Sequence, residues 1–221
     1  MLYCALSKVT THAQRKDPIR EDLVQAGIRL LADQGSGALV MRRVAAAAGV
    51  STMCVYSRFG DKAGLINAVY DAGFAKLDEA MANANVGSDP RERLMSLALA
   101  YRGFAIANPA LYSLMFERIA GFEPLIESRN DALGAGTALL IEAMTRAIDD
   151  GLVEADSPGP AAYLLWTAVN GAVGLELAQA SHHPVPAWFM DVPAGGEAML
   201  REVVETTLRG MAPAAPVVRG I

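Results

Sequence analysis

The sequence contains few of the residues from which disulfide frameworks, metal sites and catalytic centres are built. Its 221 residues include two cysteines, Cys4 and Cys54, and three histidines, His12, His182 and His183. These scattered side chains match neither metal-ligand spacing nor a catalytic triad, and two cysteines do not make a disulfide framework. A glycine-rich phosphate loop is lacking as well. The sequence therefore predicts no metal site, no cofactor and no enzymatic activity.

Aromatic residues are also scarce, at 6%, although hydrophobic residues make up 52% of the chain. Alanine dominates the hydrophobic residues, and alternation of apolar and polar residues is hard to find. Because alanine has the highest helix propensity and half-buried strands require alternation, the composition predicts an all-α protein. The length is sufficient for a sizeable core in one large or two small domains.

Long uncharged apolar runs are almost lacking too. Residues 161–180 are long enough to span a membrane, but Asn170, Glu176 and Gln179 interrupt them and no basic flank orients them. We interpret this segment as a buried helix at a subunit interface. The N-terminal residues do not contain the apolar stretch of a signal peptide. The sequence predicts a cytoplasmic protein with no membrane partner.

The net charge of −5 is distributed unevenly along the chain. Residues 1–64 contain nine Lys and Arg against five Asp and Glu, a balance of +4. Residues 65–221 contain ten against nineteen, a balance of −9. A basic segment inside an acidic protein is the charge distribution that nucleic-acid binding by one domain requires.

Residues 44–62 have the pattern of a helix-turn-helix followed by the start of another helix. Gly49 lies where the turn between two helices requires positive φ, and Ser51 is placed to cap the second helix. Val55 and Phe59 lie four residues apart, so one side of that helix is expected to pack inward. The other side is then available to enter the major groove of DNA.

The helix-turn-helix also supplies the residues expected to contact DNA. Lys62 lies at a helix start, where backbone amides attract phosphate, although a solvated lysine is the alternative. Tyr56 is expected to pack under the turn, to bring its hydroxyl to a phosphate, or both. Cys54 is either a small packing side chain or a redox-active thiol. The predicted DNA-contacting set is Arg42, Arg43, Ser51, Thr52, Met53, Cys54, Tyr56, Ser57, Arg58 and Lys62.

This segment resembles the TetR family of transcriptional regulators over residues 19–70. The matching residues include Ala48-Gly49-Val50-Ser51, Tyr56, Phe59-Gly60 and Lys62, whereas Val40 stands where the family usually has a capping Thr. The resemblance implies a helix-turn-helix protein that forms a homodimer on a double-stranded DNA operator. It also implies repression that is relieved when a small-molecule effector binds.

The chain is expected to divide into a DNA-binding domain with an N-terminal arm (residues 1–64), a ligand-sensing and dimerisation domain (65–211) and a disordered tail (212–221). Turn and capping signals predict helices in both domains. They cover residues 18–34, 41–48, 52–58, 62–83, 90–107, 110–119, a long segment ending near 151, 158–182 and 197–211.

The second domain carries apolar residues that line either an adaptable ligand pocket or an ordinary core. Residues 165–177 resemble a helix of TetR regulators with a WHG-type C-terminal domain, and Asn170 stands where that motif has histidine. Trp166 and Asn170 share a helix face, so they either meet an effector or belong to the core, where Asn170 needs a protein partner. The predicted ligand-contacting set is Phe104, Met115, Phe116, Met144, Trp166 and Asn170.

Together with these features, the resemblance to the TetR family implies a repressor released from a palindromic operator by a small, mostly apolar effector. One alternative is a helical small-molecule-binding protein or enzyme that has lost operator binding. Another is a protein-interaction adaptor, which has no salt-dependent affinity for DNA. The basic first segment favours DNA binding over both.

Overall fold

The computed structural model describes residues 17–84, 87–116, 134–180 and 196–214. These residues form α-helices and one short 3-10 helix and contain no strand, which confirms the predicted all-α class. The elements are α1 (Pro18–Gln34), η1 (Ser36–Ala38), α2 (Met41–Ala47), α3 (Thr52–Phe59), α4 (Lys62–Ala84), α5 (Pro90–Ala107), α6 (Pro109–Phe116), α8 (Gly134–Asp149), α9 (Pro158–Ala180) and α10 (Glu197–Gly210).

The helix starts follow the capping signals of the sequence. The Asp17 carboxylate accepts hydrogen bonds from the backbone N–H groups of Ile19 and Arg20, and Asp89 accepts one from Arg91. Both aspartates precede a proline at the first helical position, where a missing N–H costs nothing. Val40 precedes α2 without a side-chain hydrogen bond, as its apolar side chain requires.

Several expected features lie outside the described residues. These are the N-terminal arm (residues 1–16), the end of the predicted 110–119 helix, His182 and His183, and residues 215–221 of the predicted tail. The remaining helix ends agree with the predicted ends to within two residues.

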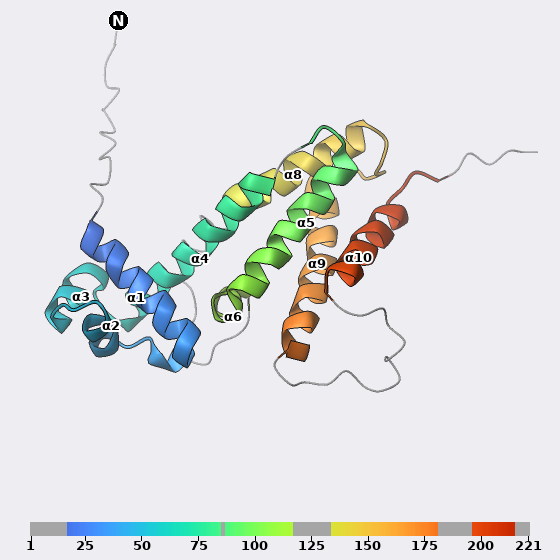
Figure 1. Ribbon diagram of the computed structural model, residues 1–221. Coiled ribbons are helices and arrows are strands. Elements are labelled where there is room, and N and C mark those ends of the chain that lie inside the picture. Colours follow the sequence, from blue (N-terminus) through green and yellow to red (C-terminus); the bar gives the residue numbers. More distant parts are fainter. Residues whose placement is uncertain (1–16, 85–86, 117–133, 181–195, 215–221) are drawn as a thin grey trace, which may run out of the picture.

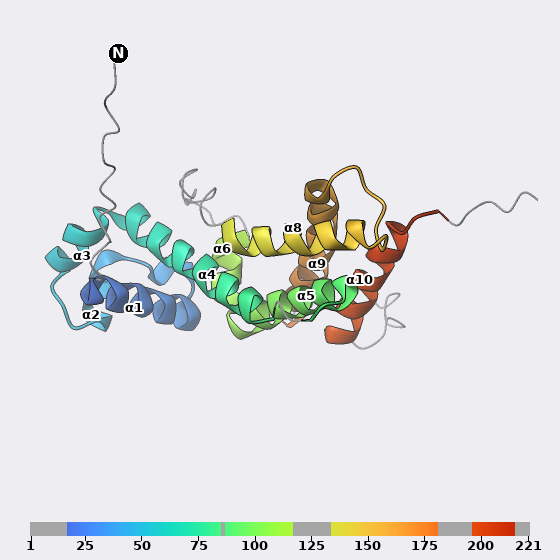
Figure 2. The same cartoon turned by 90° about the horizontal axis from the view of Figure 1, so that it is seen from above.

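The helices form two groups joined by α4 (Figures 1 and 2). Helices α1, α2 and α3 lie together at one end of the molecule, and α5, α8, α9 and α10 form a bundle at the other. Helix α4 packs against α1 and α3 near its start and against α5, α6 and α8 further along. It therefore belongs to both groups.

Two hydrophobic cores meet on α4 and correspond largely to these groups, although Leu31 and Leu39 of the N-terminal group belong to the larger core. Leu65 and Ala68 belong to the core shared by α1, α2 and α3. Ile66, Val69 and Tyr70 belong to the larger core of the C-terminal bundle. The boundary between the cores therefore runs along the length of α4, since neighbouring residues of this helix face different cores.

Over Pro158–Ala178, helix α9 is long enough and apolar enough to cross a membrane, with a mean hydropathy of 1.2. One side of α9 packs against α5, α8 and α10. Its exposed side carries Leu164 and Leu175, which are 53% and 64% exposed, and Tyr163, which is 66% exposed, lies at the edge between the two sides. The apolar character of α9 thus reflects a packed face together with an uncovered one.

The close approach of α1 and α4 depends on Gly27. A Cβ atom at this position lies 2.9 Å from Cγ2 of Val69, a buried β-branched side chain that cannot move aside. Gly103, in the interior of α5, is exposed and has no neighbour within 4 Å of an added Cβ.

We expect Gly27→Ala to be less stable than Gly103→Ala by about 1–3 kcal/mol, because only the first overpacks an interface. The helix-propensity gain of alanine, roughly 1 kcal/mol, is common to both and cancels in this comparison. Urea unfolding followed by circular dichroism measures the difference. Equal stabilities would show that α1 and α4 separate at no cost.

Candidate functional site

The helix-turn-helix is formed by α2, a tight turn and α3. Gly49 takes φ of 68° in this turn, the left-handed region that glycine enters without strain. The Val50 N–H donates to the Ala45 carbonyl at 3.0 Å, which returns the chain over the end of α2. Ser51 Oγ accepts from the Cys54 N–H at 3.2 Å and so caps α3 as predicted.

The two sides of α3 differ sharply in burial. Val55 and Phe59 are buried, at 0% and 8% exposure, and hold α3 against α1 and α4. Met53 and Tyr56 are 76% and 48% exposed, and Ser57 is exposed beside them. An exposed helix face on a rigid base can enter a major groove and contact base edges.

Basic side chains are exposed at the starts of α2 and α4, the helices that precede and follow α3 and contact it. Arg42 and Arg43 are exposed at the start of α2, where Arg43 donates to Gln34 Oε1 at 2.6 Å. Lys62 is exposed as the first residue of α4. Asp61 caps this helix by accepting from the Gly64 N–H at 2.8 Å. A lysine beside the N-terminus of a helix is suited to bind phosphate.

Arg58 is bound to other residues of the protein. Its Nε donates to Asp17 Oδ2 at 2.8 Å, and its Nη1 lies 3.1 Å from Cys54 Sγ. Desolvation raises the pKa of Asp17, but the Arg20 N–H and the Arg58 guanidinium outweigh it and hold that pKa below its usual value. The predicted DNA contact by Arg58 thus competes with a bond that braces α3 against α1.

A cavity of about 380 Å³ lies in the C-terminal bundle, between α4, α5, α6, α8 and α9. Of the predicted ligand-contacting residues, Phe116 and Trp166 line it. The other described lining residues are Phe74, Leu77, Asp78, Met81, Tyr101, Gly136, Thr137, Leu140, Ile141, Gly159, Ala162 and Tyr163. This volume is within the range of small-molecule sites.

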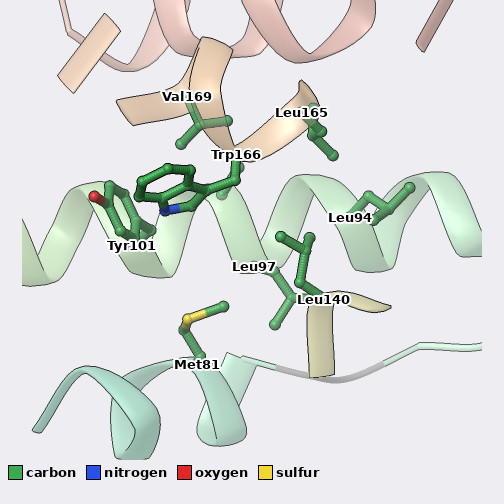
Figure 3. Close-up of a pocket in the computed structure, with 9 residues that line it drawn as sticks. Met81, Leu94, Leu97, Tyr101, Leu140, Leu165, Trp166 and Val169 are labelled. Atoms are coloured by element: carbon green, nitrogen blue, oxygen red, sulfur yellow. The ribbon is translucent and has the colours of Figure 1, made fainter. Parts of the chain in front are cut away.

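A second void of about 20 Å³ adjoins the cavity and shares Met81, Tyr101, Leu140 and Trp166 with it. In Figure 3, Trp166 extends from α9 toward α5, and its indole lies beside Tyr101. The void holds roughly one water molecule at most, so ligand chemistry belongs to the larger cavity.

Four residues of the predicted ligand set lie outside the cavity lining. Phe104, Met115 and Met144 are 5%, 7% and 0% exposed and pack in the larger core. Asn170 Oδ1 accepts hydrogen bonds from the hydroxyls of Tyr101 and Tyr112 at 2.6 and 2.8 Å. Helical periodicity shows that these side chains face inward, but it does not distinguish packed positions from the wall of a void.

The two tyrosines hold Asn170 from two other helices, α5 and α6. Burial raises the pKa of Tyr101, and the neighbouring Tyr112 raises it further. The Tyr101 hydroxyl is therefore protonated, and both hydroxyls donate to the one amide oxygen. The ring of Tyr101 also lies 5.7 Å from that of Phe116, which connects this cluster to the cavity wall.

A bidentate ion pair ties α5 to α9 near the same cluster. Arg102 Nε and Nη2 donate to Glu176 at 2.8 and 2.6 Å. These hydrogen bonds raise the pKa of Arg102 above its usual value. The sequence analysis did not identify this pair, because the residues are 74 positions apart and no local spacing relates them.

The capped turn before α3, its exposed face and the basic side chains on the neighbouring helices α2 and α4 define a DNA-binding protein of the helix-turn-helix class. Residues 23–69 match the family model for bacterial regulatory proteins of the tetR family. Residues 94–213 match the model for the tetracyclin repressor-like C-terminal domain. The chain belongs to the TetR family, and it is a transcriptional regulator rather than an enzyme.

Known proteins with similar sequences are also transcriptional regulators. The HTH-type transcriptional regulator Mb1846 of Mycobacterium bovis is 24% identical over 203 residues, covering 79% of this chain and 87% of its own. The HTH-type transcriptional regulator BetI of Rhizobium meliloti is 37% identical over 83 residues, covering 37% of this chain and 41% of its own.

Solved structures share the whole fold. A Rhodococcus protein of unknown function has a TM-score of 0.72 at 24% identity, covering 93% of this chain and all of its own. The fatty acid degradation regulator FadR from Bacillus halodurans has a TM-score of 0.67 at 18% identity, covering 86% and 98%. The helix-turn-helix and the C-terminal bundle thus form one known architecture.

The tyrosine–asparagine cluster is testable by a double-mutant cycle. We expect Asn170→Leu to lower the free energy of unfolding by about 1–3 kcal/mol, because two partly buried hydroxyls lose their acceptor. Tyr101→Phe should have a smaller effect, and its effect should nearly vanish when Asn170 is already Leu. Urea unfolding of the four proteins gives the coupling energy. Strictly additive losses would contradict a shared hydrogen-bond cluster.

Proposed function

We propose that this regulator is a dimeric repressor that leaves its operator when a small, mostly apolar effector enters the C-terminal cavity. The observation that carries this proposal is the course of α4. The helix starts with Lys62 beside the helix-turn-helix and continues to Phe74, Leu77 and Met81 in the cavity wall. One continuous helix thus connects the two sites.

On the DNA side, α3 lies in the major groove with Thr52, Met53 and Tyr56 toward the bases and the backbone. Lys62 and Arg42 bind phosphates on either side of the groove. Phosphate contacts position the protein and make its affinity salt-dependent, whereas contacts from α3 select the sequence. Arg58 is bound to Asp17 in the protein alone, so a DNA contact by Arg58 has to replace this ion pair.

On the effector side, α4 must respond to the cavity. Gly73 of α4 lies against Met115 and Leu111 of α6, and α6 also packs on α1. A ligand that displaces α4 or α6 therefore changes the position of the DNA-binding group. For release, the effector must bind the state that cannot hold DNA more tightly than the state that can.

The dimer forms through the uncovered side of α9. Leu164 and Leu175 lie on this side, with the exposed Gly171 between them along the helix, so a partner helix can approach closely. Two copies related by a two-fold axis then present two α3 helices to a palindromic operator, with half-sites about 34–36 Å apart or a multiple of that. Such a regulator acts in the cytoplasm, where the DNA is.

We expect Lys62→Ala to weaken binding to genomic fragments selected by the wild-type protein, and to lower the salt slope of log K by about 0.9 for one lost phosphate contact. Lys76→Ala is the matched control, because it removes the same charge from α4 about 21 Å further along. Fluorescence anisotropy across a salt series measures both. An unchanged slope for Lys62→Ala, or equal losses in both variants, would rule out this phosphate contact.

The dimer surface is tested by Leu175→Arg, which places a charge on the exposed side of α9. We expect the wild type to sediment as a dimer and this variant as a folded monomer, since a charge cannot be buried unpaired in an interface. Ile106→Arg changes another exposed apolar residue, 41% exposed on α5, and should stay dimeric. A dimeric Leu175→Arg, or a monomeric wild type, would refute this interface.

A further inference from the structure

The wall of the cavity contains one charged group among the residues that the structure describes, the carboxylate of Asp78. Asp78 lies on α4 between Leu77 and Met81, which also line the cavity. A carboxylate in an apolar wall is costly unless a partner compensates its charge. The partners of Asp78 therefore indicate what the cavity is built to hold.

Within the described part of the chain, one hydrogen bond to this carboxylate is formed. Asp78 Oδ1 accepts the backbone N–H of Gly136 at 2.8 Å, near the start of α8. A carboxylate has two oxygens and about four acceptor positions, so most of its capacity remains for another donor. Burial raises the pKa of Asp78, and the hydrogen bond from Gly136 offsets part of this effect. The hydrogen bond from Gly136 thus fixes the Asp78 carboxylate, but among the described residues no positive side chain neutralises its charge.

Aromatic rings make up much of the remaining wall. Phe116 lies 5.6 Å from Phe74, 5.7 Å from Tyr101 and 6.3 Å from Trp166, measured between ring centroids. Tyr163 extends the series, at 5.7 Å from Trp166. The faces of aromatic rings carry negative potential and attract cations, and tryptophan does so most strongly.

We propose that the cavity binds an organic cation, with its ammonium group against Asp78 and its apolar body among the aromatic rings. This inference rests on the proposed function of the cavity as the effector site and adds the chemical class of the effector. The described lining residues include no cation, so nothing in that part of the wall competes for Asp78. The N-terminus of α8 carries partial positive charge, which is weaker than the full charge of an ammonium group.

Other ligand classes fit this wall less well. An anionic ligand, such as a carboxylate with an apolar chain, meets like charge at Asp78 and finds no basic side chain among the described lining residues. A neutral alcohol can donate one hydrogen bond to Asp78 but leaves the charge uncompensated. The hydrogen bond from an alcohol to a carboxylate is itself charge-assisted, but only an ammonium group also brings the opposite charge next to the carboxylate.

Three probes that each carry a phenyl ring on a chain of three or four methylene groups separate these classes, namely phenylbutylamine, phenylbutanol and phenylbutyrate. Isothermal titration calorimetry at neutral pH, on the full chain, measures the affinity of each. We expect the amine to bind about tenfold tighter than the alcohol, which corresponds to roughly 1.4 kcal/mol, and the carboxylate to bind weakest.

Asp78→Asn should reduce amine affinity to that of the alcohol and leave alcohol affinity nearly unchanged. The amide oxygen still accepts from the Gly136 N–H, so the start of α8 is retained, and urea unfolding checks this. Glu79→Gln is the matched control, because it removes the same charge from the next, exposed residue of α4 and should leave all three affinities unchanged.

The proposal is overturned if the amine does not bind at millimolar concentration, if it binds no tighter than the alcohol, or if Asp78→Asn weakens both equally. A DNA-binding assay with the same probes separates this inference from the proposed function. Amine binding that leaves the DNA complex intact would refute the effector role but keep the cation site. Release of DNA by phenylbutanol or phenylbutyrate, without amine binding, would keep the effector role and refute the cation site.

Discussion

The rest of the structure depends on α4 being one uninterrupted helix that packs in two cores. Its 23 residues span about 35 Å. Leu65 and Ala68 fix its first part to α1, α2 and α3, whereas Phe74, Leu77 and Met81 fix its later part to the C-terminal bundle. Because one continuous helix takes part in both cores, a shift of α4 in one core requires a response in the other. Helix α4 alone can therefore couple the helix-turn-helix to the C-terminal cavity.

The helix-turn-helix could be predicted from sequence because its determinants are local. Gly49, Ser51, Val55 and Phe59 lie within eleven residues, and each acts on a neighbour through backbone freedom, capping or one-sided burial. Helix starts at Asp17 and Asp89 were predictable for the same reason, since a cap bonds to amides two or three residues away. Interactions of this range leave a recognisable pattern in a single sequence.

The contacts that shape the second site are long-range, and the sequence carries no comparable pattern for them. Asn170 bonds to tyrosines 58 and 69 positions away, Arg102 pairs with Glu176, and Arg58 turns to Asp17 across 41 positions. Periodicity placed Met144 and Phe116 alike on inward faces, yet one is sealed in the core and the other lines the cavity. Which inward faces enclose a void depends on how five helices meet, and this is a property of the tertiary structure.

The cavity remains open for two reasons. Small residues lie where the helices cross, and hydrogen bonds and an ion pair fix the positions of the helices around it. Gly136, Gly159 and Ala162 contribute almost no side-chain volume to the walls on α8 and α9. Protein interiors normally close such space, since a void forfeits the contacts of every atom that lines it. Here Asp78 fixes the start of α8, while Asn170 and the Arg102–Glu176 pair fix α9 against α5 and α6. These bonds need exact helix positions, so they oppose the collapse that apolar packing alone would favour. The same polar groups that keep the space open also determine what can fill it.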